Sequence, residues 1–137
     1  MSTARVCMTA GAVFGLMGVA SGAMGAHWLQ NILDPGDLKT FETGIRYQMY
    51  HALALLATGV AADRWRVVWF TWACWLFPAG VVFFSGSLYL LVFSGIGIFG
   101  AVAPLGGVCL MAAWASVAVA PFAIKPRVNP NTVGMES

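Results

Sequence analysis

Residues 67–91 read VVWFTWACWLFPAGVVFFSGSLYLL, an uncharged apolar run that is longer than the roughly 20 residues a membrane-spanning helix needs. Similar runs occupy residues 6–26, 47–62 and 103–123, although the second is short. The chain of 137 residues is 60% hydrophobic and only 9% charged, with a mean hydropathy of +0.81. A soluble domain of this size would lack the polar residues to cover its surface. We therefore predict an integral membrane protein.

Helices are the expected spanning elements, because a backbone in lipid must satisfy its own hydrogen bonds and no alternating β-barrel pattern is visible. An amphipathic stretch from Asp37, with Asp37 as N-cap, extends the short second run outward. The predicted architecture is an all-α, antiparallel up-down-up-down bundle. It comprises a transmembrane domain at 1–124, with helices at 6–26, 38–62, 67–92 and 103–123, and a polar cytoplasmic tail at 125–137.

The charged residues predict the orientation of this bundle. The basic residues at the two chain ends and in the second connection fall on one side, and these are Arg5, Arg64, Arg66, Lys125 and Arg127. Lys and Arg are enriched in cytoplasmic loops, so both termini are predicted to be cytoplasmic in a multi-pass protein of the cell inner (plasma) membrane. A cleavable signal peptide is the alternative at the N-terminus, but the first apolar run is longer than a typical signal core.

Small residues indicate where the helices pack closely. Five glycines at alternating spacings of four and three share one face of the first helix, and they are Gly11, Gly15, Gly18, Gly22 and Gly25. Such a seam lets a neighbouring backbone approach in lipid. Pro104 suits the first turn of the last helix, and Gly106 and Gly107 favour close packing there.

Threading the helices up and down brings most of the intramembrane polar side chains to the outer leaflet. The candidate cluster comprises His27, Glu42, Arg46, Tyr47, Gln48, His51, Ser85, Ser87 and Tyr89. Ionisable groups in a membrane are costly unless paired, so the cluster is either a functional site or a set of structural pairs. The structural interpretation predicts a Glu42–Arg46 ion pair and a hydrogen bond from His51 to Tyr47, Ser85 or a carbonyl.

Other chemistry has less support. His27 and His51 could bind haem or a quinone, but no close ligand pair nucleates a metal site, so we predict neither metal nor cofactor. Cys7, Cys74 and Cys109 are isolated and read as small buried hydrophobes. The net charge of +2 sits at helix ends and does not indicate nucleic-acid binding. No nucleophile with its base, phosphate-binding loop or dinucleotide motif appears.

Four segments carry a resemblance to a known family: GAMGAH at 22–27, FETGIRYQMYHAL at 41–53, FSGSLY at 84–89 and APLGG at 103–107. In order, they resemble the small membrane proteins grouped as domain of unknown function 423, which include bacterial YgdD-like proteins and the eukaryotic transmembrane protein 256. The similarity spans residues 11–114, and Met24 replaces the usual Phe. It implies a small multi-span protein of the bacterial inner membrane and brings no established activity.

Three functional interpretations follow. The first is a non-enzymatic protein that contacts membrane lipid and acts as a homo-oligomer or as an accessory subunit of a larger membrane complex. The second is a small-solute or proton-linked transporter whose outward pocket holds Glu42, Arg46 and His51. The third is a haem or quinone site that uses His27 and His51.

Overall fold

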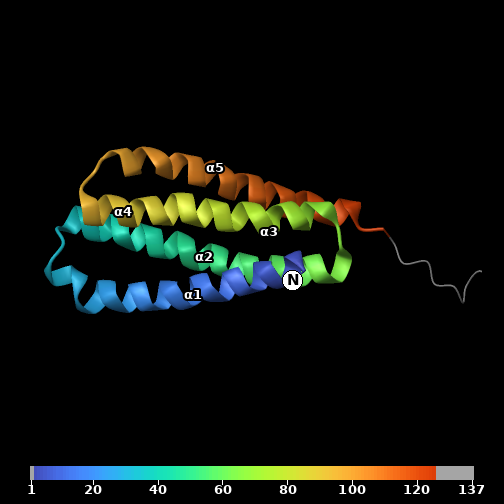
Figure 1. Ribbon diagram of the computed structural model, residues 1–137, viewed down its shortest axis with the longest axis horizontal. Helices are drawn as coiled ribbons and strands as arrows, with labels where there is room; N and C mark the ends of the chain where they lie inside the picture. Colours follow the sequence, from blue (N-terminus) through green and yellow to red (C-terminus); the bar gives the residue numbers. More distant parts are fainter. Residues whose placement is uncertain (1, 126–137) are drawn as a thin grey trace, which may run out of the picture.

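The computed structural model describes residues 2–125, and all regular secondary structure in that range is helical (Figure 1). The predicted tail therefore lies, apart from Lys125, outside the described residues. Helices α3, η2 and α4 follow one another without a break and form one continuous helix. The elements are α1 (Thr3–His27), η1 (Leu29–Asn31), α2 (Pro35–Trp65), α3 (Val68–Val81), η2 (Val82–Gly86), α4 (Ser87–Ser94), α5 (Ile98–Val119) and η3 (Ala120–Ala123).

Three helical segments are long and apolar enough to cross a membrane, namely residues 3–31, 68–94 and 98–123. This confirms the prediction of an all-helical membrane protein. The 31-residue α2 is long enough as well, but its composition is more polar and does not by itself mark it as a span.

The helices run alternately in opposite directions (Figure 1). Helix α1 packs mainly on α2 and also contacts α3, and α5 packs mainly on α3, η2 and α4. The main apolar core takes residues from all four long helical segments: Cys7 from α1, Leu55 from α2, Phe77 from α3 and Leu110 from α5.

Each helix differs from its predicted bounds by one to five residues, and two of the helix starts have a clear local cause. Helix α2 begins at Pro35 rather than residue 38, because the Asp34 carboxylate accepts hydrogen bonds from the backbone N–H groups of Gly36 (2.8 Å) and Asp37 (3.0 Å). Helix α5 begins at Ile98, five residues before the predicted start, so Pro104 lies inside it instead of in its first turn. The preceding helix ends at Gly95, whose φ of +68° needs glycine, and the chain reverses within a few residues.

Glycines of α1 contact α2 at intervals of seven residues. Gly11, Gly18 and Gly25 are buried, and a Cβ atom at Gly18 would lie only 2.4 Å from the Met49 sulfur. By contrast, a Cβ atom at Gly22 would have no neighbour within 4 Å among the described residues, and one at Gly15 would touch only Ala52, at 4.0 Å. The seam is narrower than predicted, because Gly11, Gly18 and Gly25 are the glycines of α1 at which an added Cβ atom would lie within 3.4 Å of α2.

The continuous helix of α3, η2 and α4 contains a proline followed by a wide turn. Pro78 lies inside α3, where it cannot donate a backbone hydrogen bond, and residues 82–86 in the next turn adopt a π-helical conformation. Helix α5 approaches this turn closely. A Cβ atom at Gly106 would lie 2.3 Å from the backbone nitrogen of Phe84, so only glycine fits there without a shift of the backbone.

Candidate functional site

The side chain of Gln48 joins three helices inside the protein. It is 3% exposed, and its Nε2 donates a hydrogen bond to the backbone carbonyl of Phe14 in α1 at 2.8 Å. The hydroxyl of Tyr89 in α4 donates to its Oε1 at 2.9 Å. The Tyr89 ring fits over Gly44, where a Cβ atom would come within 2.7 Å of it. Gln48 and Tyr89 therefore form a polar clamp across α1, α2 and α4.

His51 forms a second link, from α2 to α5. Its side chain is 5% exposed, with Nδ1 2.6 Å from the carbonyl oxygen of Tyr47 and Nε2 3.2 Å from the indole nitrogen of Trp114. An indole N–H can only donate, so Nε2 accepts and Nδ1 carries the proton that bonds to Tyr47. The ring is thus a neutral imidazole with both nitrogens in use. Ligation of a metal or haem at His51 would require breaking one of these two bonds.

Four of the candidate residues are exposed instead. His27, Glu42 and Arg46 are exposed near the same end of the molecule, and Tyr47 is 38% exposed. Glu42 and Arg46 line a shallow hollow of about 200 Å³ beside Gly22 and Gly25, but the predicted ion pair between them is not formed. Within residues 2–125, no three His, Cys, Asp or Glu side chains are grouped so as to hold a metal ion.

The two serines of the π-helical region do not join the clamp. Ser87 donates to the backbone carbonyl of Phe84 at 2.9 Å, within its own helix. Ser85 is fully buried, and in the described part of the chain its hydroxyl is the one buried side-chain polar atom without a hydrogen-bond partner. The predicted cluster therefore divides into an internal clamp, a histidine–tryptophan link, two separate serines, the exposed Tyr47 and an exposed charged group.

A lateral hollow of about 660 Å³ lies between α2 and α5. Trp114 hydrogen-bonds to His51 within it, and Arg46 is its charged residue. The sequence did not indicate Trp114, although a single Trp in an alanine-rich helix was a signal for a specific contact. The residues that line the hollow are Arg46, Tyr47, Tyr50, His51, Phe84, Gly107, Leu110, Met111 and Trp114.

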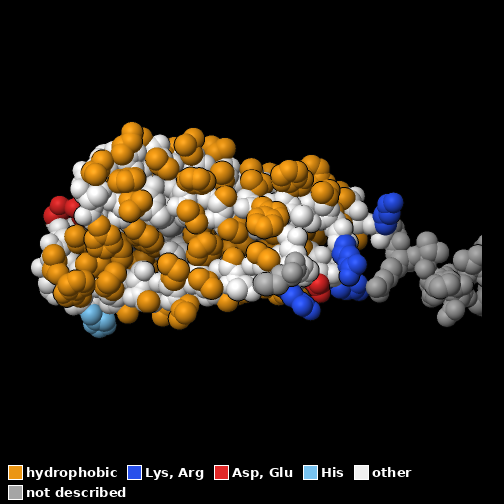
Figure 2. Space-filling view, in the orientation of Figure 1, with side chains coloured by type: hydrophobic (Ala, Val, Ile, Leu, Met, Phe, Trp, Pro, Cys, Tyr) orange, Lys and Arg blue, Asp and Glu red, His pale blue; other side chains and the backbone are white. Residues whose placement is uncertain are grey.

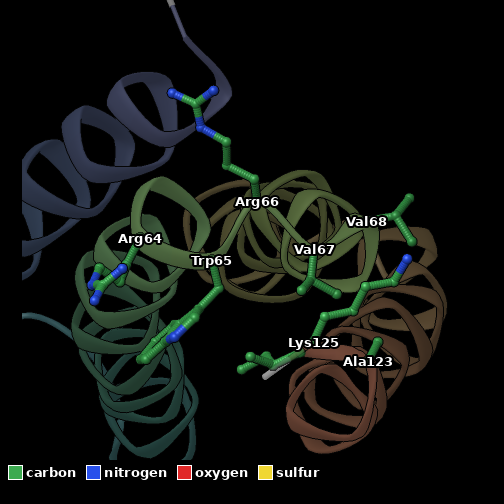
Figure 3. A pocket seen from close by; sticks show the side chains of 8 residues that line it. Arg64, Trp65, Arg66, Val67, Val68, Ala123 and Lys125 are labelled. Carbon is green, nitrogen blue, oxygen red and sulfur yellow. The ribbon is translucent and has the colours of Figure 1, made fainter. Parts of the chain in front are cut away.

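A second hollow, of about 680 Å³, lies between the end of α2, the start of α3 and the end of η3, and it is basic (Figure 3). Arg64 and Trp65 come from the end of α2, and Lys125 follows η3. Arg66 ends α2 in a left-handed conformation with φ of +49°, and its side chain points toward α1. The remaining lining residues are apolar and comprise Val67, Val68, Ala123 and Ile124.

The chain is similar to a family and to several bacterial proteins. Residues 21–107 match the family described as "Protein of unknown function (DUF423)". The UPF0382 membrane protein SSP2132 of Staphylococcus saprophyticus is 41% identical over 120 residues, which cover 88% of this chain and 99% of that protein. The UPF0382 membrane protein YwdK of Bacillus subtilis is 42% identical over 85% of this chain and 95% of its own length.

The UPF0382 inner membrane protein YgdD of Escherichia coli K12 is 37% identical over 91% of this chain and 95% of its own length. No solved structure matches the chain. Together with the three apolar helices, these relatives identify a multi-pass protein of the inner (plasma) membrane. The chain belongs to the DUF423 family of membrane proteins of unknown function.

Proposed function

We propose that this is a non-enzymatic membrane protein that crosses the bilayer four times and acts through its surfaces, as a homo-oligomer or as an accessory subunit of a larger membrane complex. The observation that carries the proposal is the use of the polar interior. The buried polar side chains form hydrogen bonds with other helices or with the backbone of their own helix, and they are Gln48, His51, Ser87 and Tyr89. Such bonds hold helices together in lipid, and they assign these four side chains to helix packing.

The fourth span in this proposal is α2. Its mean hydropathy is lowered by polar residues such as Gln48, His51 and Thr58, which are buried against other helices. The side chains that face outward along the same stretch are apolar and include Leu53 and Val60. A helix of this kind can cross a bilayer, because its polar face meets protein and its apolar face meets lipid.

Cytoplasmic termini are the second part of the proposal. The antiparallel order brings Arg5, Arg64, Arg66 and Lys125 to one end of the molecule, where Lys and Arg side chains gather in Figure 2. Cytoplasmic flanks carry such an excess of Lys and Arg. Transport is not favoured by a specific observation, because the hollow beside His51 and the basic hollow are separate.

Cysteine labelling tests the topology. In a background where Cys7, Cys74 and Cys109 are replaced by alanine, single cysteines at Asp34 and Ser137 are treated with a membrane-impermeant maleimide. We expect labelling of Asp34→Cys in intact cells and of Ser137→Cys only after the membrane is opened. Labelling of both positions from the same side would refute the four-span arrangement.

Co-purification tests the role as a subunit. The protein is extracted from its native membrane in a mild detergent, and its mass, copy number and associated proteins are determined by native mass spectrometry. We expect either a defined oligomer or a stoichiometric partner. A monomer without a partner, together with turnover of a substrate, would overturn the non-enzymatic assignment.

A further inference from the structure

We propose that the basic hollow between the ends of α2 and η3 binds the headgroup phosphate of an anionic phospholipid, with the first carbons of its acyl chains against the apolar wall of the hollow. This inference deepens the proposed function by naming a partner in the membrane. It rests on the proposed topology only for the assignment of that lipid to the cytoplasmic leaflet.

The electrostatic character of the hollow favours an anion. Arg64 lines it from the end of α2 and Lys125 from the segment after η3, while the side chain of Arg66, which also lines it, points toward α1 (Figure 3). No carboxylate of the described residues lines it; Asp63 lines a different hollow, next to Arg66 and the start of α1. Among residues 2–125, the arginines and Lys125 form no ion pair. Guanidinium and ammonium groups without a carboxylate partner are suited to phosphate oxygens.

The apolar part of the lining favours a lipid over a free anion. Val67, Val68, Ala123 and Ile124 contribute no polar side chain, and Trp65 lies between the ends of α2 and η3 (Figure 3). Indole rings prefer the level of the lipid headgroups, where one edge is wet and the body is apolar. A hollow with cations at its rim and hydrocarbon in its wall matches a headgroup with its glycerol and the first carbons of its chains.

The basic hollow is separate from the hollow beside His51. Trp65 follows Tyr47 by 18 residues, which is five helical turns, so residues that line the two hollows share one face of α2. Between them, His51 of α2 hydrogen-bonds Trp114 of α5, and Ala54 is buried in the apolar core. The proposal therefore concerns the headgroup end of the lipid.

The test measures binding of defined lipids by the full-length protein after delipidation in a mild detergent. Dioleoylphosphatidylglycerol is compared with dioleoylphosphatidylcholine, which has the same chains and no net charge, and with inorganic phosphate, which has no chains. Native mass spectrometry reports bound lipid, and the melting temperature reports stabilisation. We expect saturable binding of phosphatidylglycerol, weaker binding of phosphatidylcholine and no stabilisation by inorganic phosphate.

Charge substitutions locate the site. Arg64→Gln and Lys125→Gln should each weaken phosphatidylglycerol binding by about fivefold, the change expected for one basic residue near an anionic lipid. Arg5→Gln removes the same charge at the same end of the molecule but outside the hollow, and it should leave binding unchanged. The charge-conserving variants Arg64→Lys and Lys125→Arg should retain binding, which separates loss of charge from loss of folding.

Three outcomes would overturn the proposal. Equal binding of the two phospholipids would show that the headgroup charge is not recognised. Unchanged binding by the Arg64→Gln, Lys125→Gln double variant would show that the lipid binds outside this hollow. Stabilisation by inorganic phosphate as large as that by phosphatidylglycerol would indicate a site for soluble anions. Because the assay is done in detergent, its failure is independent of the labelling and co-purification results that test the proposed function.

Discussion

Replacement of Gly106 by alanine tests the close approach of α5 to the π-helical turn. The added Cβ atom would lie 2.3 Å from the backbone nitrogen and 2.7 Å from the Cα atom of Phe84. These atoms belong to the backbone and cannot rotate away. Helix α5 must therefore retreat by about 1 Å before ordinary contact at 3.4 Å or more is restored.

The expected cost has three components. Overpacking of a tight contact destabilises a protein by about 1–3 kcal/mol. A retreat of α5 also stretches the 3.2 Å bond between Trp114 and His51, which is worth about 0.6–1.7 kcal/mol in a membrane protein. Against these, alanine is about 1 kcal/mol better than glycine in a helix. The net result is a loss of about 2 kcal/mol in the free energy of unfolding.

The neighbouring residue supplies the control. A Cβ atom at Gly107 would meet only the edge of the Phe84 ring, at 3.9 Å, so Gly107→Ala should leave stability unchanged or raise it by up to about 1 kcal/mol. Both variants are unfolded with SDS in mixed micelles and followed by far-UV circular dichroism. Equal unfolding midpoints for Gly106→Ala and Gly107→Ala would refute the inferred contact between α5 and the π-helical turn.

Three further predictions concern α1, α2 and α4. Gln48→Leu should lower the free energy of unfolding by about 1–3 kcal/mol and Tyr89→Phe by about 1 kcal/mol, and the double variant should lose less than their sum, because both remove the same bond. Gly18→Leu should shift the melting temperature and the size-exclusion profile more than Gly22→Leu, because a Cβ atom at Gly22 meets no neighbour in the described chain. A larger effect of Gly22→Leu would place α2 against the other face of α1. Glu42→Arg and Arg46→Glu should change the free energy of unfolding additively, within about 0.5 kcal/mol, because the two side chains are not paired. Recovery of stability in the double exchange would show that they are paired.

The helices were predictable because their signal is long and local. Runs of apolar residues of membrane-spanning length identified three helices, the amphipathic stretch from Asp37 completed the second one, and the errors lie at the ends. Asp34 and Asp37 are equally good N-caps by residue type, and only the folded chain shows that Asp34 binds the free N–H groups. Pro104 suggested a helix start, but a proline inside a membrane helix is tolerated where neighbouring groups compensate.

The candidate site was predictable in its residue types and not in its pairings. Spacing along α2 placed Gln48 and His51 near one another, but their partners are the carbonyl of Phe14 and the indole of Trp114, which are 34 and 63 residues away. The glycine spacing in α1 likewise defines a face but not the line on that face that meets α2. The partners of Gln48 and His51, and the line of α1 that meets α2, depend on how whole helices pack against one another, and a local sequence pattern does not carry that information.

The π-helical turn at residues 82–86 has the geometry of a regular helix into which one extra residue has been inserted. Each residue of an α-helix turns the chain by about 100°, so the segment after Gly86 is rotated by roughly that angle relative to a helix that continued the phase of α3. Tyr89 reaches Gln48, and Val92 reaches the core, in this rotated frame. A chain shortened by a single residue within this turn could therefore keep every helix and still aim Tyr89 away from its partner.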